Sequence, residues 1–403
     1  MMTTRRRRSP GGWFAVSLAL VTVLGPAGTD MFLASLPDIV AEFSATAASG
    51  QLTLTVYLLA MGAGQLVFGP ITDAFGRRIP LLVALLAFLL ASVWAAASPD
   101  MAALLAARTV QGLAAALTLV VALSMVRDAA SGARAAQLFA LLMTIEGLAP
   151  VLAPSLGGVV DERFGWRAVL LVLAGLAAIA LANTALTLPE TLPRGSRSSV
   201  RPAAVLRTYA RIARDGNFLL PTLGLSAVFF FLFGYIGGAP FIYQERFGLD
   251  ATGFGLVFGG TGITVMLGAI VAGRTVTRWG AARLALAGTV TVFAGAVLAV
   301  GLTLAGAGLL GVVIGMGVAL FGIGVAEATL MSLAMASQDT SLGSTAALLG
   351  AFQLMISSAA TPLAGATVPS GPVPWLAFLV AAGAIAVAIV AVSASRAKNG
   401  AQA

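Results

Sequence analysis

The stretch Gly69-Pro-Ile-Thr-Asp-Ala-Phe-Gly-Arg-Arg78 lies between two long apolar runs and returns in outline later in the chain. Its counterpart, Gly273-Arg-Thr-Val-Thr-Arg-Trp-Gly280, again has two glycines seven residues apart and begins 204 residues further along. A second match, Pro154-Ser-Leu-Gly157 with Pro362-Leu-Ala-Gly365, has an offset of 208 residues. Because two separate matches agree closely on the offset, the sequence predicts a duplication, with two halves built on one pattern.

The composition of the chain places it in a lipid bilayer. Of its 403 residues, 59% are hydrophobic and only 9% are charged, whereas soluble domains carry about a quarter charged residues. Apolar runs long enough to cross a hydrocarbon core of about 30 Å recur about twelve times. We therefore predict an all-α integral membrane protein with twelve transmembrane helices. The predicted spans are residues 13–36, 49–71, 79–97, 101–126, 135–160, 167–188, 218–242, 251–272, 281–304, 309–336, 343–368 and 373–393.

The basic residues predict the orientation of the chain in the membrane. The formal net charge is +8, and most Lys and Arg residues lie in alternate gaps between the spans, as in Arg5 to Arg8 and the long connector. Since Lys and Arg favour the cytoplasmic side, we expect both termini in the cytoplasm and the protein in a bacterial cytoplasmic membrane. The predicted domains are a six-helix bundle at 1–188, a cytoplasmic linker at 189–216 and a second six-helix bundle at 217–403. Because the basic residues are divided among the gaps, we expect no nucleic acid partner.

The chain has no cysteine and no histidine. Their absence excludes disulfides, thiolate metal sites and nucleophiles activated by histidine, so proton chemistry must use Asp, Glu, Lys, Arg or Tyr. The predicted spans contain no cluster of Asp residues for a metal-dependent transferase and no repeated filter sequence for a channel. We therefore expect neither an enzyme nor a resident metal or cofactor.

Several motifs resemble those of the major facilitator superfamily, in particular its twelve-helix drug:proton antiporters. The stretch from Gly69 to Arg78 is similar to the loop motif of that family, although Ala74 stands where a basic residue is usual. Arg108-Thr-Val-Gln-Gly112 is similar to the fourth-helix motif, and Ala153-Pro-Ser-Leu-Gly-Gly158 to the fifth-helix antiporter motif. The resemblance implies the major facilitator fold, with two pseudo-symmetric six-helix bundles.

Within that family the chain is most similar to Bcr/CflA-type exporters and their chloramphenicol and florfenicol relatives. The likeness is carried by Thr29-Asp-Met-Phe-Leu-Ala-Ser-Leu-Pro37, Gln51-Leu-Thr-Leu-Thr-Val-Tyr57 and Tyr235-Ile-Gly-Gly-Ala-Pro-Phe241. It implies a monomeric exporter of small amphipathic drugs, above all phenicols, that exchanges drug for protons by alternating access. The alternative is a porter of the same fold for a sugar or an amino acid, which should have more Asn, Gln and charged residues within its spans.

Four ionisable side chains fall within the predicted spans: Asp30, Arg108, Glu146 and Glu327. Burying such a group at membrane depth costs at least a few kcal/mol, so each needs a partner, water or a proton. We predict that Asp30 is the proton site and that it is coupled to Arg108, because movement of a guanidinium toward or away from a carboxylate controls proton binding. The alternative is a permanent ion pair that joins the first helix to the fourth.

The candidates for the substrate cavity are two carboxylates and three aromatic residues. Glu146 lies one turn before Pro150 and could hold a proton or a cationic drug, while a structural glutamate bonded to a neighbouring helix is the alternative. Glu327 lies in a glycine-rich run and is the second acidic candidate. Phe32, Tyr57 and Tyr235 are candidates to line an apolar drug pocket, although packing or lipid contact is the commoner role of an aromatic residue in a span.

Two further groups are predicted to support the transport cycle. The resemblance implies that the loop motif forms a gate on the cytoplasmic side; a topology-fixing loop with solvated charges is the alternative. We expect the fifth-helix motif to break or thin that helix and let a neighbour approach, with tight static packing as the alternative. The gate residues are Gly69, Asp73, Gly76, Arg77, Arg78 and Asp128. The antiporter-motif residues are Pro150, Pro154, Gly157 and Gly158.

Overall fold

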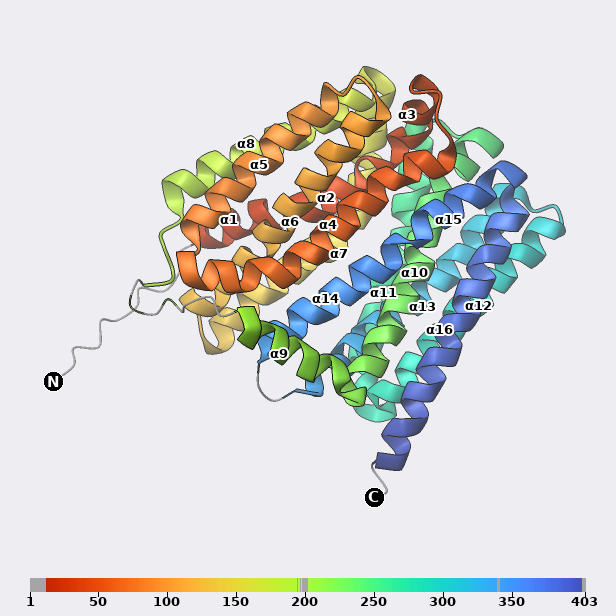
Figure 1. The fold of residues 1–403 in the computed structure, drawn as a ribbon. Helices are drawn as coiled ribbons and strands as arrows, with labels where there is room; N and C mark the ends of the chain where they lie inside the picture. The colour runs from red at the N-terminus through yellow and green to blue at the C-terminus, as the bar shows by residue number, and fades with distance from the viewer. Residues whose placement is uncertain (1–11, 194, 196, 198–201, 339–340, 401–403) are drawn as a thin grey trace.

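The computed structural model describes residues 12–193, 195, 197, 202–338 and 341–400, and these residues are almost entirely helical (Figure 1). Twelve of the described helical segments are long and apolar enough to cross a membrane, which confirms the predicted number. The chain is therefore a multi-pass membrane protein. Arg5 to Arg8 lie outside the described residues.

The first half of the chain contains six spans. They are the segment Gly12–Glu42, α4 (Ala47–Phe75), α5 (Arg78–Ala96), α6 (Met101–Ala129), α7 (Gly132–Phe164) and α8 (Trp166–Thr187). The second half contains the other six. They are α10 (Gly216–Phe241) with the π-helical turn η3 (Ile242–Arg246), α11 (Ala251–Trp279), α12 (Ala281–Leu304), α13 (Gly308–Ala336), α14 (Leu342–Ser358) continued by α15 (Ala360–Thr367) and η4 (Val368–Ser370), and α16 (Pro372–Gly400).

Several helices extend beyond the predicted apolar runs. The apolar run in the eighth span ends near residue 272, whereas α11 continues to Trp279 through Arg274 and Arg278. Basic side chains near the C-terminus of a helix interact favourably with its dipole and with the polar membrane surface. The helix can therefore continue beyond the hydrocarbon core. Gly280, with φ of +78°, then ends α11 in a backbone conformation that favours glycine.

The first span is not the continuous helix that its apolar run predicts. It consists of α1 (Gly12–Thr22), α2 (Leu24–Asp30), the short 3-10 helix η1 (Leu33–Ser35) and α3 (Leu36–Glu42). Pro26 and Pro37 cannot donate the backbone hydrogen bonds of an uninterrupted helix, and Pro37 is suited to the first turn of α3. Asp30 is the last residue of α2, so the acid lies at the interruption.

The twelve spans form two bundles that lie side by side, α1 to α8 in one and α10 to α16 in the other (Figure 1). The amphipathic helix α9 (Pro202–Arg214) connects them on the side where α1 begins and α16 ends. We call this side the terminal face. The other side, which carries α3, is called the opposite face.

Two seams of close packing join the bundles. α4 packs against α14 and α15, and α7 packs against α11. The hydroxyl oxygens of Thr55 and Thr361 are 2.8 Å apart across the first seam. In the second seam, a Cβ added to Gly158 would overlap the carbonyl of Ala251 at the start of α11, whereas a Cβ on Gly147 would meet nothing within 4 Å. The bundles are therefore tightly joined toward the opposite face.

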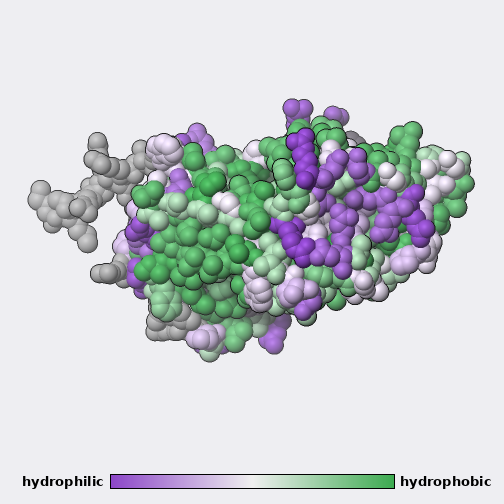
Figure 2. Space-filling view, turned by 90° about the horizontal axis from the view of Figure 1, so that it is seen from above, coloured by the Kyte–Doolittle hydropathy of each residue, from purple (hydrophilic) through white to green (hydrophobic). Residues whose placement is uncertain are grey.

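The outer surface of the spans is apolar, as contact with lipid requires. Large side chains such as Leu90, Leu171 and Ile263 are exposed on the spans. Figure 2 looks down from the top of Figure 1: hydrophobic residues cover a broad area, and hydrophilic residues gather in a band at the middle and right. In this view, the polar surface lies mostly in that band.

Candidate functional site

Asp30 is a buried carboxylate that forms no ion pair with any residue that the structure describes. The residue is only 6% exposed, at the interruption of the first span. Among the described residues no basic nitrogen lies within 4 Å of its carboxylate. The direct ion pair with Arg108 that the sequence suggested is therefore not formed in this conformation.

Arg108 is held by aromatic faces and amide groups instead. It is fully buried on α6, and its guanidinium carbon lies 4.8 Å from the ring centroid of Phe32 and 4.4 Å from that of Tyr57. Its Nη1 donates a hydrogen bond to Oε1 of Gln111, and Gln111 in turn donates to the hydroxyl of Ser92. Cation–π contacts of a desolvated guanidinium contribute about 2 kcal/mol, so the arginine is stabilised without a carboxylate.

The three aromatic cavity candidates are packed inside the protein in this conformation. Phe32 and Tyr57 have no exposed surface and cover Arg108. Tyr235 stacks on Phe258 with ring centroids 5.2 Å apart, and on Trp375 at 6.0 Å, within the second bundle. Each ring is covered by a protein partner in this conformation, and a role in lining the substrate cavity stays a prediction.

Glu146 and Glu327 are brought together from the two bundles. Glu146 lies on α7 and Glu327 on α13, and they are close enough for the charge of one to act on the other. Each is enclosed by protein on most sides, yet part of each residue is accessible to water. Both helices pack against α11, which links them. The sequence named the two acids separately and gave no sign of this pairing.

The predicted gate residues form a charge network at the terminal face. Nη1 of Arg77 is 2.7 Å from Oδ1 of Asp73, and its Nε is 2.9 Å from Oδ2 of Asp128. Burial opposes the charge on Arg77, but these hydrogen bonds hold the pKa of its guanidinium above the ordinary value. The grouping of these three residues, which the resemblance implied, is present. Gly69, by contrast, has no neighbour within 4 Å of an added Cβ.

Glu190, which follows α8, completes this network and was not singled out from the sequence. Its carboxylate accepts hydrogen bonds from the backbone N–H groups of Arg77 (2.9 Å) and Arg78 (3.2 Å) at the start of α5. Gly76 makes the turn with φ of +97°, and a Cβ there would lie 2.6 Å from Oε2 of Glu190. A carboxylate at a helix N-terminus satisfies free N–H groups and favours the dipole. Asp73, the nearby acid of the loop motif, pairs with the side chain of Arg77 instead.

Glu190→Ala is expected to lower the free energy of unfolding by about 1–2 kcal/mol, as the loss of a helix cap does. Burial raises the pKa of Glu190, but the N–H groups outweigh it and hold the pKa below its ordinary value. The stabilisation is therefore present at neutral pH and is lost as the pH falls through the folded-state pKa. Thermal unfolding in detergent at pH 7 measures it.

Arg197→Ala is the matched comparison for Glu190→Ala. Arg197 approaches Glu190 only at 3.7 Å, and both side chains are partly exposed, so its removal should cost less than about 1 kcal/mol. Equal destabilisation by the two variants would contradict the cap assignment.

The proline–glycine motif leaves α7 continuous. Pro150 and Pro154 lie inside the helix, which runs unbroken from Gly132 to Phe164, so the predicted break is wrong. The two glycines do permit close approach. A Cβ on Gly157 would overlap the carbonyl of Met31 in the same bundle, and a Cβ on Gly158 would overlap that of Ala251 in the other bundle. The motif therefore joins α7 to a neighbour on each side.

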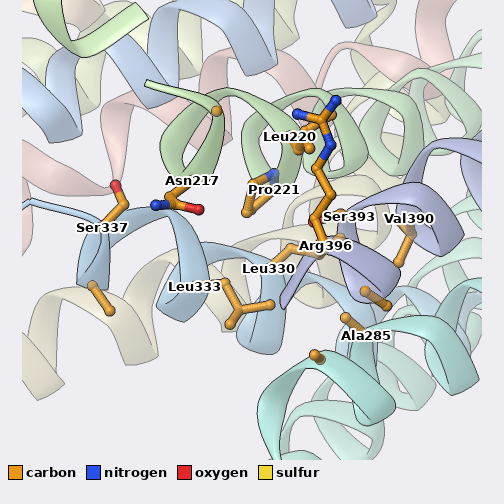
Figure 3. Close-up of a pocket in the computed structure, with 14 residues that line it drawn as sticks. Asn217, Leu220, Pro221, Ala285, Leu330, Leu333, Ser337, Val390, Ser393 and Arg396 are labelled. Carbon is orange, nitrogen blue, oxygen red and sulfur yellow. The ribbon is translucent and has the colours of Figure 1, made fainter. Parts of the chain in front are cut away.

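A cavity of about 330 Å³ lies in the second bundle near the terminal face (Figure 3). Leu330, Leu333 and Val390 contribute apolar walls, and the side chain of Arg396 extends away from them toward Leu220 (Figure 3). None of the predicted substrate residues lines this cavity. It is separate from the surroundings of Asp30.

The chemistry available within the spans is proton binding. The described part of the chain has no group of three or more side chains that could hold a metal ion. Among the described residues of the spans, the buried or enclosed carboxylates include Asp30, Glu146, Asp161 and Glu327, and carboxylates at membrane depth can bind and release protons as their exposure to water changes.

The family of the chain follows from its sequence as a whole. The family model of the Major Facilitator Superfamily matches residues 18–364. The chain belongs to the major facilitator superfamily. This major facilitator protein is thus a secondary transporter of small molecules, and not an enzyme.

Bacterial members of the superfamily are similar to this major facilitator chain over much of its length. The uncharacterized MFS-type transporter YdgK of Bacillus subtilis (strain 168) is 32% identical over 368 residues, 90% of this chain and 92% of that protein. A chloramphenicol resistance protein of Pseudomonas aeruginosa is 34% identical over 280 residues, 68% of this chain and 65% of that protein. The multidrug resistance protein MdtL of Escherichia coli O127:H6 is 31% identical over 234 residues, 58% of this chain and 59% of that protein.

Solved structures share the fold. The human organic anion transporter MFSD10 superposes with a TM-score of 0.68 at 18% identity, with 96% of this chain and 99% of that chain covered. The xylose transporter XylE of E. coli, in a partially occluded inward-open conformation, gives a TM-score of 0.73 at 14% identity, with 93% and 97% covered. The predicted fold class, twelve spans in two six-helix bundles, is confirmed.

Proposed function

We propose that this transporter exports small amphipathic drugs, above all neutral phenicols, in exchange for protons. The observation that carries the proposal is Asp30, a buried carboxylate at the interruption of the first span that has no basic partner among the described residues. Such a group can take a proton where water is excluded and release it where water enters, which couples proton movement to alternating access. Each elementary charge that crosses 100 mV supplies about 2.3 kcal/mol.

The substrate class is supported by the relatives. Two of the proteins similar to this chain are named for resistance to chloramphenicol and to multiple drugs. The apolar character of the spans also suits an amphipathic drug better than a sugar, which needs many hydrogen-bonding side chains. We therefore retain phenicols as the main substrate class.

The proposed orientation places the terminal face in the cytoplasm. The described arginines of that face include Arg77, Arg127, Arg211 and Arg278, whereas the opposite face has few, such as Arg163. This distribution is what the positive-inside rule requires. We retain 1–188 and 217–403 as the two transport domains, with 189–216 as the cytoplasmic linker.

The Arg77 network is proposed to close the cytoplasmic side. The described residues of this network lie in the first bundle or at the start of the linker. The linker helix α9 packs against α10 and α14 of the second bundle. The hydroxyl of Tyr209 on α9 donates to the carbonyl of Leu66 on α4, at 3.0 Å. The linker thus contacts both bundles where they must separate to admit drug from the cytoplasm.

Glu146→Gln and Glu327→Gln should each reduce export of cationic drugs about tenfold or more while sparing neutral phenicols. Removing one carboxylate of a pair that faces a bound cation removes a strong electrostatic attraction at low dielectric. Resistance of cells to ethidium and to chloramphenicol, at equal protein level in the membrane, measures the two effects. Glu245→Gln, at an exposed glutamate of η3, is the matched control. Equal loss of cationic and neutral export would assign the pair to coupling or folding.

Drug accumulation in cells tests the proposed function as a whole. Cells that express the chain should hold less labelled chloramphenicol than cells that lack it, and an uncoupler that collapses the proton gradient should abolish the difference. Export that survives the uncoupler would contradict proton coupling. Equal accumulation of every tested phenicol in cells with and without the protein would contradict the proposed substrate class.

A further inference from the structure

A second pair of carboxylates lies near the opposite face, where the first span passes α7. Asp161 on α7 is 4% exposed, and its Oδ1 accepts a hydrogen bond of 3.0 Å from the hydroxyl of Ser35. Its Oδ2 is buried and has no hydrogen-bond partner among the described residues. The carboxyl group of Asp38, an exposed residue of α3, lies within hydrogen-bonding reach of Asp161. A proton shared between the two carboxyl groups would give Oδ2 of Asp161 a hydrogen-bond partner. It would also remove the repulsion between two like charges.

In the part of the chain that the structure describes, no basic group pairs with these two carboxylates. Among the residues that the structure describes, no arginine nitrogen lies within 4 Å of either carboxylate, and this includes Arg163, two residues beyond Asp161. The other acids of this region have partners of their own. Glu42 pairs with Arg167 and accepts from Trp166, Glu162 accepts a hydrogen bond from Thr252, and Asp250 caps the first turn of α11.

Asp161 lies about one helical turn from Asp30, on the side toward the opposite face. α7 touches the first span at Gly157, where an added Cβ would overlap the carbonyl of Met31, the residue after Asp30. Asp161 follows Gly157 by about one helical turn, roughly 6 Å. Ser35 follows Asp30 by five residues, roughly 7 Å at helical rise. These rises place Asp161 about one helical turn from Asp30 along the contact between α7 and the first span.

We propose that Asp38 and Asp161 form a proton-exchange site on the outer side of the membrane. This site accepts protons from the outer solution and transfers them to Asp30, and it carries them in the reverse direction when Asp30 releases them. The inference rests on the proposed function, because it assumes that the coupled proton passes through Asp30. A proton from the outer solution binds a carboxylate oxygen of Asp38, moves to Oδ2 of Asp161 and then passes through water to Asp30. At each step one O–H bond breaks as the next forms, and the donor returns to its carboxylate form. Because Oδ1 of Asp161 accepts the hydrogen bond from Ser35, Oδ2 of Asp161 is the oxygen that carries the proton.

The test uses everted membrane vesicles, in which the outer side of the protein faces the lumen. Addition of chloramphenicol should release protons from acid-loaded vesicles of the wild type, and the rate should depend on luminal pH. Asp161→Asn should reduce this proton release at least about tenfold and flatten its dependence on luminal pH, because the amide cannot carry a proton. Exchange of labelled for unlabelled drug at equal pH on both sides should stay within about twofold of the wild type, since it needs no net proton transfer.

Asp161→Glu should restore proton release, and Asp100→Asn should leave it unchanged. Asp100 is an exposed acid of the same bundle, and Asn replaces Asp well as the cap of α6. An unaltered luminal pH dependence in Asp161→Asn would overturn the inference. Loss of drug exchange together with proton release would also overturn it, because Asp161 would then be structural. A wild type that exchanges drug but moves no protons would defeat the proposed function itself.

Discussion

Asp30→Asn is expected to lower proton-driven drug export at least about a hundredfold, the scale of effect for loss of an acid–base group. The amide has the size and the hydrogen-bonding reach of the acid, so the interruption after α2 and the neighbouring packing should be kept. It cannot bind or release a proton, and Asp161, which lies about one helical turn away, does not occupy its position. Labelled chloramphenicol export from cells measures the loss.

Two controls separate proton coupling from folding in this variant. Asp100→Asn removes the same charge from an exposed cap in the same bundle and should export normally. Binding of chloramphenicol to purified Asp30→Asn protein should remain, because the neutral drug does not need the acid's charge. Full resistance of cells that carry the Asn form would exclude Asp30 as the proton site.

Gly158→Leu is expected to stop transport while the protein still inserts into the membrane. A Cβ at this position would overlap the carbonyl of Ala251 in the other bundle, so the added side chain would force α7 and α11 apart near the opposite face. Overpacking of this kind costs about 1–3 kcal/mol or more, which shifts a two-state equilibrium about 5-fold to 150-fold away from the closed form. The transporter would remain open toward the opposite face.

Cysteine accessibility measures this shift directly, because the chain has no native cysteine. A single cysteine introduced at Ser155, whose hydroxyl donates to the carbonyl of Gly255 across the seam, should be labelled faster in Gly158→Leu. Gly147→Leu is the control, since nothing lies within 4 Å of an added Cβ on that residue of the same helix. Normal export by Gly158→Leu would show that the seam is not closed during the cycle.

The sequence predicted the number of spans for an identifiable physical reason, whereas the gate residues were implied by the family resemblance. Lipid requires continuous apolar helices, so composition alone counts them. Asp73 and Arg77 are four residues apart, and such a pair meets on one side of a helix or its end. Gly76 needs a positive φ, which is a local property of one residue.

The remaining parts of the site depend on contacts that no local pattern encodes. Glu190 caps α5 from 112 residues away along the chain, and its place after an apolar run gives no sign of that partner. Glu146 and Glu327 come within range of each other's charge only because the two bundles pack together. Asp161 lies one residue past the predicted end of its apolar run, and only the longer helix α7 places it against Ser35.

Arg108 shows how a correctly chosen residue can have an unexpected partner. A buried arginine near a buried aspartate suggests an ion pair, but the rings of Phe32 and Tyr57 occupy its two sides in this conformation. The choice between a carboxylate and two aromatic faces depends on helix rotation, which the sequence does not determine. Coupling between Asp30 and Arg108 therefore remains a prediction for another stage of the cycle.

The most direct test of the account is drug uptake into proteoliposomes under an imposed pH gradient. Purified protein is reconstituted in vesicles with an acid interior, and labelled chloramphenicol is added outside at neutral pH. The account predicts accumulation of drug above its external concentration, in exchange for protons, which ceases when an ionophore removes the gradient and is absent in Asp30→Asn. Accumulation that is the same with and without the pH gradient, or that persists in Asp30→Asn, would contradict it.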